Sequence, residues 1–463
     1  MIALFFTATL LLLAIYCFIR KKFLYLAVPS MLFLPEYYAI EFGESLPLLT
    51  ATRIILIVFY IYAYINRKRN INLQNILIQH SKDLFLIAGY FLFRIISNLY
   101  YITTYTQPAK TILSIVFEQF LFLVAIYLLY PTKEEINNLL KVIVYCSVVI
   151  FIIGIFESIT YYRFFDELNT VSRTIINEHY VRAGLLRSTT TMQMPGLFGN
   201  MCVLMLPLIL YLQKITAQKR YIAFTAIDFL AIIHSGSRSD VMFFFIIIFS
   251  FICLELKHRG LRELKTIIYN SFCVVALLLV FIVPISYINP NCRYFYTATA
   301  KSVLNEFGCN YDLDEDAPEG VDGYGKNAGK NGSGGINSRT RQFSGITYAM
   351  KRNCLFGMGS GAANRNSVYY YINNRWYPYS TIDIALVEIL YCEGALGLFA
   401  YFLLFCYIAI SLIKVRKKQP ADLYISIILY FLSYLLCTLS TANMFSFLML
   451  GLVLIQFYRF TDK

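Results

Sequence analysis

Long apolar stretches recur along most of this chain, and they restrict its fold more than any other feature. Hydrophobic residues make up 58% of the sequence, charged residues only 14%, and the mean hydropathy is +0.61. A helix of about 20 apolar residues crosses a hydrocarbon core of about 30 Å, and lipid leaves only helices or closed barrels as spanning structures. Barrel strands would alternate in segments of about ten residues, a pattern that this sequence lacks. We therefore predict an all-α polytopic integral membrane protein.

The apolar stretches predict about 12–13 transmembrane helices, and two long polar segments divide them. The predicted spans are 2–19, 23–40, 46–65, 83–103, 109–130, 139–159, 196–213, 219–235, 240–256, 266–285, 383–413, 421–438 and 441–459. Span 23–40 contains Pro35 and is alternatively a re-entrant segment. The predicted divisions are N-terminal helices (1–159), a first extracytoplasmic loop (160–195), central helices (196–285), a large extracytoplasmic loop (286–382) and C-terminal helices (383–463).

Clusters of basic residues indicate how the chain is oriented. Five of them, at 20–22, 67–69, 214–220, 257–265 and 414–418, fall on one side if the N-terminus lies outside and the C-terminus inside. The positive-inside rule then places them in the cytoplasm and accounts for most of the net charge of +13, so nucleic acid is not an expected partner. Cys292, Cys309 and Cys354 fall in the large outer loop, where a disulfide is possible.

The stretch "HSGSRSD" (234–240) interrupts an apolar run on the predicted outer side, so its Arg238 is not an orientation signal. The outer loops add further arginines: Arg182, Arg187, Arg339 and Arg341. From 323 to 382 the sequence has no Asp or Glu. A planar guanidinium binds phosphate with two parallel hydrogen bonds, which lysine cannot do. Any single arginine could belong to a solvated basic loop, but the set favours a polyanionic ligand. We interpret the acidic run "DLDED" (312–316) as a solvated charge run.

Four ionisable residues fall inside predicted spans: Arg53, Arg94, Glu118 and Asp228. Such groups are costly in hydrocarbon and usually face the bundle interior or a wet cavity. For the two acids we expect structural ion pairs, for example Glu118 with Arg94. For the two arginines, an ion pair and a role in a cavity facing the outer loops both stay open.

Three stretches together resemble the O-antigen polymerase (Wzy) and O-antigen ligase (WaaL) superfamily over roughly residues 180 to 400. They are "VRAGLLRSTTTMQMPGLFGNMCVLMLPL" (181–208), "GSRSD" (236–240), and "SRTRQFSGITYAMKRNCLFGMGSG" (338–361) followed by "TIDIALVEILYCEGALGLFAYF" (381–402). In the third stretch, Arg339, Phe343, Gly357 and Gly359 match the family pattern of an arginine, an aromatic residue and a Gly-x-Gly. In the helix that follows, Asp383, Gly394 and Gly397 match a polar start and a Gly-x-x-Gly.

The resemblance implies a membrane glycosyltransferase that acts on glycans carried by polyprenyl diphosphate. An acceptor hydroxyl attacks the anomeric carbon and the lipid diphosphate leaves, and arginines stabilise that leaving group without a metal or other cofactor. The implied catalytic residues are Arg238 and Asp383. The candidate substrate-binding residues are the outer-loop arginines Arg182, Arg187, Arg339 and Arg341, together with Arg94 and Arg53 from within the predicted spans. Asp383 would accept the hydroxyl proton and share a helical face with 387, 390, 394 and 397. Alternatively, it is a first-turn acid of that helix.

The residue at position 383 also helps to distinguish the polymerase branch of this superfamily from the ligase branch. The ligase branch typically carries a histidine in that register, so the aspartate favours a polymerase of O-antigen, capsule or exopolysaccharide repeat units. The alternatives are a ligase and a transporter or flippase of the lipid-linked unit, although no internal repeat supports transport. The expected partners are the polyprenyl-diphosphate-linked glycan, membrane lipid and a chain-length regulator protein. The expected location is the bacterial plasma (inner) membrane, with the active site on the extracytoplasmic side.

Overall fold

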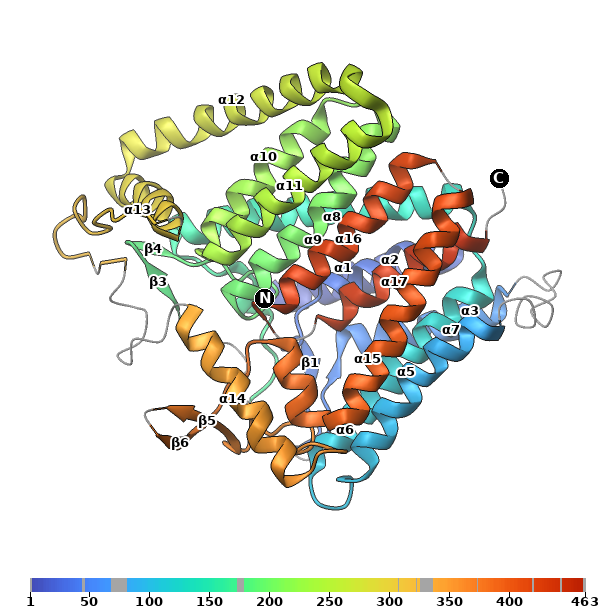
Figure 1. The fold of residues 1–463 in the computed structure, drawn as a ribbon. Coiled ribbons are helices and arrows are strands. Elements are labelled where there is room, and N and C mark those ends of the chain that lie inside the picture. Colours follow the sequence, from blue (N-terminus) through green and yellow to red (C-terminus); the bar gives the residue numbers. More distant parts are fainter. Residues whose placement is uncertain are drawn as a thin grey trace.

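This computed structural model describes residues 2–43, 46–67, 81–172, 179–306, 308–321, 323–324, 336–372, 374–418, 420–441 and 444–460. Within those ranges, eight helices are long and apolar enough to cross a membrane. This confirms the predicted fold class, an all-α polytopic membrane protein (Figure 1). The Gly/Asn-rich stretch "GYGKNAGKNGSGG" (323–335), which its composition predicts to be flexible, falls largely on 325–335, outside the described residues.

Helices make up most of the described chain, and short hairpins interrupt them. The α-helices are α1 (Ile2–Ile19), α2 (Leu24–Phe33), α3 (Ala51–Ile65), α5 (Ser81–Leu99), α6 (Thr106–Ser114), α7 (Leu121–Leu129), α8 (Lys133–Thr160), α9 (Pro195–Thr216), α10 (Arg220–His234), α11 (Arg238–Arg259), α12 (Leu264–Ile288), α13 (Pro290–Glu306), α14 (Ile336–Arg352), α15 (Ala385–Lys418), α16 (Ala421–Thr438) and α17 (Phe445–Phe460). Antiparallel hairpins pair β1 (Ala39–Ile40) with β2 (Leu49–Thr50), β3 (Val181–Arg182) with β4 (Leu185–Leu186), and β5 (Val368–Ile372) with β6 (Arg375–Tyr379).

Each of the thirteen predicted spans overlaps at least one of these helices, but the helix in the second span is shorter than expected. α2 has 10 residues, which rise about 15 Å, half of the hydrocarbon core. The prediction that 23–40 crosses the membrane as one helix is therefore wrong. The predicted span 109–130 is a continuous helical run, α6 and α7, joined by a π-helical turn, η1 (Ile115–Phe120).

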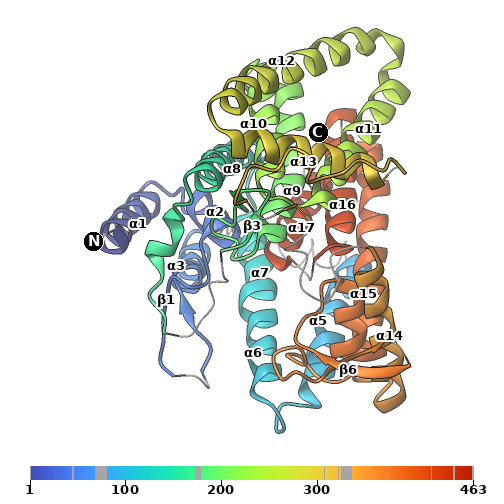
Figure 2. The ribbon, with the colours of Figure 1, turned by 90° about the vertical axis from the view of Figure 1, so that its left-hand side faces the viewer.

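α9 forms the centre of the bundle. In its apolar window 89% of the residues are buried, because α8, α10, α11 and α16 pack around it. α1 and α12 contrast with it, since the protein buries only one side chain of each helix, Cys17 and Ile267. Figure 2 shows both helices at the periphery of the bundle. An apolar helix that the protein does not cover is suited to contact with lipid.

One end of each of several helices contributes to a single ionic network. Lys214 Nζ lies 3.0 Å from Glu255 Oε2 and 3.0 Å from Glu263 Oε2, and Arg259 pairs with Asp422. These residues come from the ends of α9, α11 and α16 and from the turn between α11 and α12. The network therefore joins segments at or next to three of the basic clusters that were predicted to share one side, 214–220, 257–265 and 414–418.

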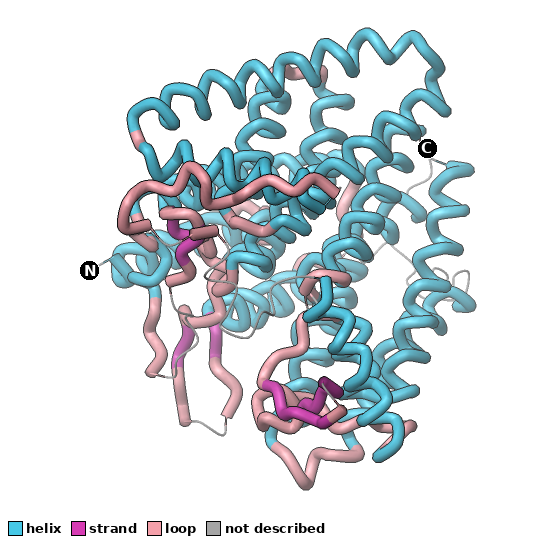
Figure 3. The backbone as a smooth tube through the Cα atoms, turned by 60° about the vertical axis from the view of Figure 1, so that its left-hand side comes forward, coloured by secondary structure: helices cyan, strands magenta, loops and turns pink. Residues whose placement is uncertain are grey.

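The predicted outer loops contain secondary structure. The large loop folds into α13, α14 and the β5–β6 hairpin, which lies beside α14 at one edge of the molecule (Figure 3). The acidic run is held against α13, because Asp314 Oδ1 accepts from Tyr294 Oη (2.7 Å) and Lys301 pairs with Glu315 (3.0 Å). All four acids, Asp312, Asp314, Glu315 and Asp316, are nevertheless exposed, which agrees with the expectation of a solvated charge run. Cys292, Cys309 and Cys354 are free thiols, so the possible disulfide does not form.

α15 is broken near its first third. Gly394 has φ 65° and ψ −155°, a conformation that favours glycine, and the neighbouring chain segment 354–359 inserts beside it. The amides of residues 358 and 359 donate to the carbonyls of 391 and 392, and the amides of 395 and 396 donate to those of 354 and 355, over 2.7–3.2 Å. The break in the apolar helix therefore leaves these backbone groups paired.

Candidate functional site

A tight hairpin places two arginines against the break between α10 and α11. The two-residue turn between β3 and β4, Ala183 and Gly184, has positive φ at both positions (48° and 71°), the geometry that matches the twist of a short hairpin. Arg182 lies at the end of β3 and Arg187 directly after β4. The local sequence therefore presents both guanidinium groups on the same side of the protein.

Both guanidinium groups hold the backbone of the break. Arg187 Nε donates to the carbonyl oxygen of Ser235 at 2.9 Å, and Arg182 Nη1 donates to that of Gly236. Gly236 has φ 63°, and a Cβ there would lie 3.0 Å from Arg187 Nε. The glycine is thus required both by the turn and by the close approach of the arginine.

Arg238 is the first residue of α11, where the unpaired amides and the helix dipole favour an anion. It is half-buried, and its Nη1 donates to Ser302 Oγ of α13 at 3.3 Å. This contact joins the break to the large outer loop. Three segments that the sequence placed outside, 160–195, 235–240 and 286–382, therefore meet at this point.

Asp240 provides a carboxylate within this group. It is fully buried, and Gly199 of α9 makes room for it, since a Cβ there would overlap Asp240 Oδ2. The charges of Arg187 and of Arg339, on α14, both reach Asp240. The structure thus brings Arg339 toward the same point, and we name Arg182, Arg187, Arg238 and Arg339 the arginine cluster.

Electrostatic repulsion acts between neighbouring members of the arginine cluster. Burial and, to a smaller extent, the charge of Arg182 lower the pKa of Arg187 to about 9, while Asp240 opposes this. Of these four guanidinium groups, those of Arg187 and Arg339 act on the buried carboxylate of Asp240. An anionic ligand here would remove repulsion between cations as well as gain charge-assisted hydrogen bonds.

A large cavity lies against the loop that follows Arg187. It has a volume of about 710 Å³, within the range of small-molecule sites. Thr191, Met192 and Gln193 line it, and they belong to the loop 188–194 that follows Arg187. Glu157 fixes this loop, because its carboxylate accepts from the amides of Thr189 (3.2 Å) and Thr190 (3.1 Å). One short, rigid loop therefore connects the arginine cluster to the cavity wall.

The two intramembrane arginines line this cavity as members of ion pairs. Arg53 Nε lies 2.6 Å from Glu118 Oε1, and Ser114 Oγ donates to the other carboxylate oxygen at 2.6 Å. Arg94 Nη2 lies 2.9 Å from Glu393 Oε1. The suggested pair of Arg94 with Glu118 is therefore wrong, although the expectation of an ion pair for Glu118 is confirmed.

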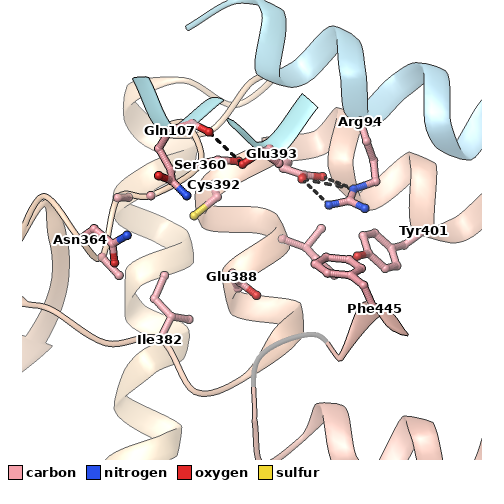
Figure 4. A pocket seen from close by; sticks show the side chains of 15 residues that line it. Arg94, Gln107, Ser360, Asn364, Ile382, Glu388, Cys392, Glu393, Tyr401 and Phe445 are labelled. Atoms are coloured by element: carbon pink, nitrogen blue, oxygen red, sulfur yellow. Dashed lines mark hydrogen bonds and ion pairs between the residues drawn. The ribbon is translucent and has the colours of Figure 1, made fainter. Parts of the chain in front are cut away.

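A smaller branch of about 220 Å³ adjoins the Arg94–Glu393 pair (Figure 4). Both volumes share Arg94, Gln107 and Asn364 in their walls. Glu393 directly precedes the break at Gly394, so the broken helix delivers this carboxylate to the cavity. The sequence analysis did not identify Glu393 as a candidate site residue. Its position within a long apolar stretch could have indicated one, because acids in such stretches usually face the bundle interior or a wet cavity.

Asp228 departs from the ion-pair expectation. It is fully buried in α10, and neither carboxylate oxygen has a hydrogen-bond or salt-bridge partner among the described residues. The prediction of a structural ion pair for this acid is wrong.

Asp383 lies outside the helix that was expected to contain it. α15 begins at Ala385, two residues after Asp383. The side-chain amide of Gln342, on α14, bonds both the side chain and the backbone of Asp383. Gln342 Nε2 donates to Asp383 Oδ2 (2.8 Å), and the Asp383 backbone amide donates to Gln342 Oε1 (3.0 Å). The predicted common face with residues 387 to 397 is wrong, because α15 starts later and breaks at Gly394. Gln342 lies one turn after Arg339, so one helix positions Asp383 and presents an arginine of the cluster.

Arg341 is the one predicted site residue on α14 that is left exposed. It follows Arg339 by two positions and so occupies a different face of the helix. Within the described residues, no group of three or more His, Cys, Asp and Glu side chains could hold a metal ion. No protein-family model matches the chain, and no curated protein matches it.

Proposed function

We propose that this chain is a membrane glycosyltransferase that polymerises polyprenyl-diphosphate-linked repeat units into a surface polysaccharide in the bacterial plasma membrane. The observation that carries the proposal is that Arg182, Arg187 and Arg238 meet at the break before α11, and that Arg339 lies within electrostatic range of Asp240 in its first turn. A lipid diphosphate is an anion, and each of its tetrahedral phosphate groups offers pairs of oxygens that a planar guanidinium binds with two parallel hydrogen bonds. The resemblance of residues 180–400 to O-antigen polymerases agrees with this ligand.

The reaction needs one bond to form and one to break. The oxygen of an acceptor sugar hydroxyl attacks the anomeric carbon, and the bond from that carbon to the diphosphate oxygen breaks. The arginine cluster stabilises the charge that develops on the leaving diphosphate. Asp383, held by Gln342, would accept the proton that the hydroxyl loses.

The cavity beside the loop 188–194 would hold the sugar portion of a substrate. Its walls offer amide and hydroxyl groups such as Gln107, Gln119 and Thr111. The charges of Arg53 and Arg94 are each paired with a carboxylate, so these walls suit neutral hydroxyl groups more than a second diphosphate.

A second candidate is a transporter of the same lipid-linked unit. The broken α15 favours it, since helices interrupted near a buried polar site are typical of secondary transporters. A ligase that moves finished glycan to a different acceptor would use the same diphosphate site.

One assay separates these functions. Purified protein in liposomes receives a synthetic polyprenyl-diphosphate repeat unit as its sole substrate. A polymerase yields a ladder of lengthening lipid-linked chains and free polyprenyl diphosphate. A ligase yields product after a different acceptor is added, and a transporter moves the lipid across the bilayer with no new glycosidic bond.

Two arginine variants complete the test. Arg238→Ala should lose the ladder, while Arg293→Ala, an exposed arginine on α13, should keep it. A ladder of normal length from Arg238→Ala protein would refute the role of the cluster.

A further inference from the structure

The β5–β6 hairpin carries an unusual strand. All five residues of β6 are exposed, and three of them are aromatic: Trp376, Tyr377 and Tyr379. Successive residues of a strand point to opposite faces, yet Trp376 (39%) and Tyr377 (43%) are both well exposed. Aromatic side chains therefore lie on both faces of the strand, and the protein covers each face only in part.

The hairpin is fixed to the start of a membrane-spanning helix. The Tyr391 hydroxyl on α15 donates to the Ser367 carbonyl (2.8 Å) and accepts from the Tyr369 amide (3.2 Å) at the base of β5. Tyr391 lies about 9 Å along the axis from the first residue of α15, Ala385. The hairpin thus sits at the level at which this apolar helix begins, and Figure 1 shows it beside α14.

The surroundings of the hairpin are basic. Arg375 on the hairpin and Lys351 and Arg352 at the end of α14 are exposed, and the chain has no Asp or Glu between 323 and 382. Arg352 Cζ lies 4.5 Å from the ring of Tyr348, which in turn packs 5.1 Å from the ring of Trp376. Positive charge and aromatic rings therefore share one surface.

We propose that the β5–β6 hairpin lies in the headgroup layer of the membrane, on the leaflet at which α15 begins, and binds anionic phospholipid there. Tyr and Trp favour this layer because their rings are apolar and their polar groups remain wet. Basic residues at this depth attract anionic headgroups. A lipid headgroup layer wets both faces of β6, whereas a glycan chain would stack on one face and leave the other in water.

The anchor would also fix α14 relative to the membrane. α14 packs against β5 and presents Arg339 and Gln342. A hairpin held in the headgroup layer would keep these residues at the depth of lipid-borne phosphates. The proposal does not rest on the proposed function, because the hairpin could anchor α14 whatever reaction the protein catalyses.

Trp376 is the sole tryptophan of the chain, so tryptophan emission, excited at a wavelength that tyrosine does not absorb, reports on this hairpin alone. Full-length protein is reconstituted in vesicles of phosphatidylcholine and phosphatidylglycerol whose acyl chains are brominated either near the headgroup or near the terminal methyl. The proposal predicts blue-shifted emission, loss of intensity with headgroup-proximal bromine, and little quenching by aqueous iodide. The matched control is Trp376→Phe combined with Tyr311→Trp, in the exposed acidic loop, which iodide should quench and brominated lipid should not.

The dependence on anionic lipid is tested with Arg375→Glu. Its side chain is exposed, so the hairpin should still fold, but the blue shift in phosphatidylglycerol vesicles should diminish toward the value in phosphatidylcholine alone. Three results would overturn the proposal: Trp376 quenched by iodide as strongly as the control tryptophan, no response to brominated lipid, or an emission change that requires soluble polysaccharide instead of lipid.

Discussion

The Arg94–Glu393 pair should dominate the stability of the region around the broken helix. The two side chains are only 3% and 6% exposed, and Arg94 Nε and Nη2 lie 2.9–3.2 Å from the Glu393 carboxylate oxygens. Removing one partner of a buried pair costs about 3–5 kcal/mol, because the other charge remains buried without compensation. Both residues border the small cavity, where water can solvate a charge that has lost its partner. We therefore expect each single substitution to lower the free energy of unfolding by about 3 kcal/mol.

The two single substitutions should differ. Arg94→Met leaves the Glu393 carboxylate with the Asn98 amide at 3.5 Å. Glu393→Gln leaves the Arg94 guanidinium near three aromatic rings, of which Phe445 is closest at 4.7 Å. A cation beside an aromatic ring retains about 0.5–2 kcal/mol of interaction. Arg94→Met should therefore be the more destabilising change, and the double variant should be less destabilised than the sum of the two.

The assay is unfolding of purified protein by SDS titration in mixed micelles, followed by far-ultraviolet circular dichroism. Lys301→Met removes an exposed ion pair with Glu315 and serves as the control that should leave the midpoint unchanged. Additive effects of the two substitutions, or single losses no larger than the control, would refute the argument that the pair is buried and coupled.

Three further outcomes follow from the site and the broken helix. Arg238→Lys keeps the charge but loses the planar fork, so the initial rate of chain extension should fall roughly tenfold, and an unchanged rate would exclude bidentate binding. Gly394→Ala should lower the free energy of unfolding by about 1–3 kcal/mol, because φ is 65° and the new Cβ would lie 2.5 Å from the Gly357 amide nitrogen. Gly196→Ala, where the nearest atom is 3.9 Å away, is the control for that unfolding measurement. Asp383→Asn should lower the initial rate of chain extension by ~10²-fold, and Gln342→Ala should lower it by less. Equal losses in the two variants would indicate that Asp383 only holds α14 in place and does not accept the proton.

The sequence predicts the membrane fold because each helix that crosses lipid must be apolar, so each predicted span is visible in the sequence by itself. It also predicts that the break at 235–240 and the arginines of 182–187 share one side, because charge bias sets orientation. It could not predict that Arg182 and Arg187 donate to the carbonyls of Ser235 and Gly236, since tertiary packing determines those contacts.

The ion-pair partners illustrate the same limit. Arg94 and Glu118 fall in neighbouring predicted spans and are plausible partners by sequence distance alone. The break at Gly394 instead turns Glu393 toward Arg94, and Arg53 takes Glu118. The short α2 was misjudged for a related reason, because apolar residues that pack inside a bundle look like residues that face lipid.

The most direct test of the account measures the binding of polyprenyl diphosphate, without a glycan, to the purified protein. Each arginine of the cluster should contribute a charge-assisted hydrogen bond of about 1.5–3 kcal/mol, which corresponds to about tenfold or more in affinity. Arg238→Gln and Arg339→Gln should each weaken binding by that amount, and Arg293→Gln should not change it. Equal affinity of all three folded variants and the unaltered protein would contradict the claim that the arginine cluster binds the diphosphate.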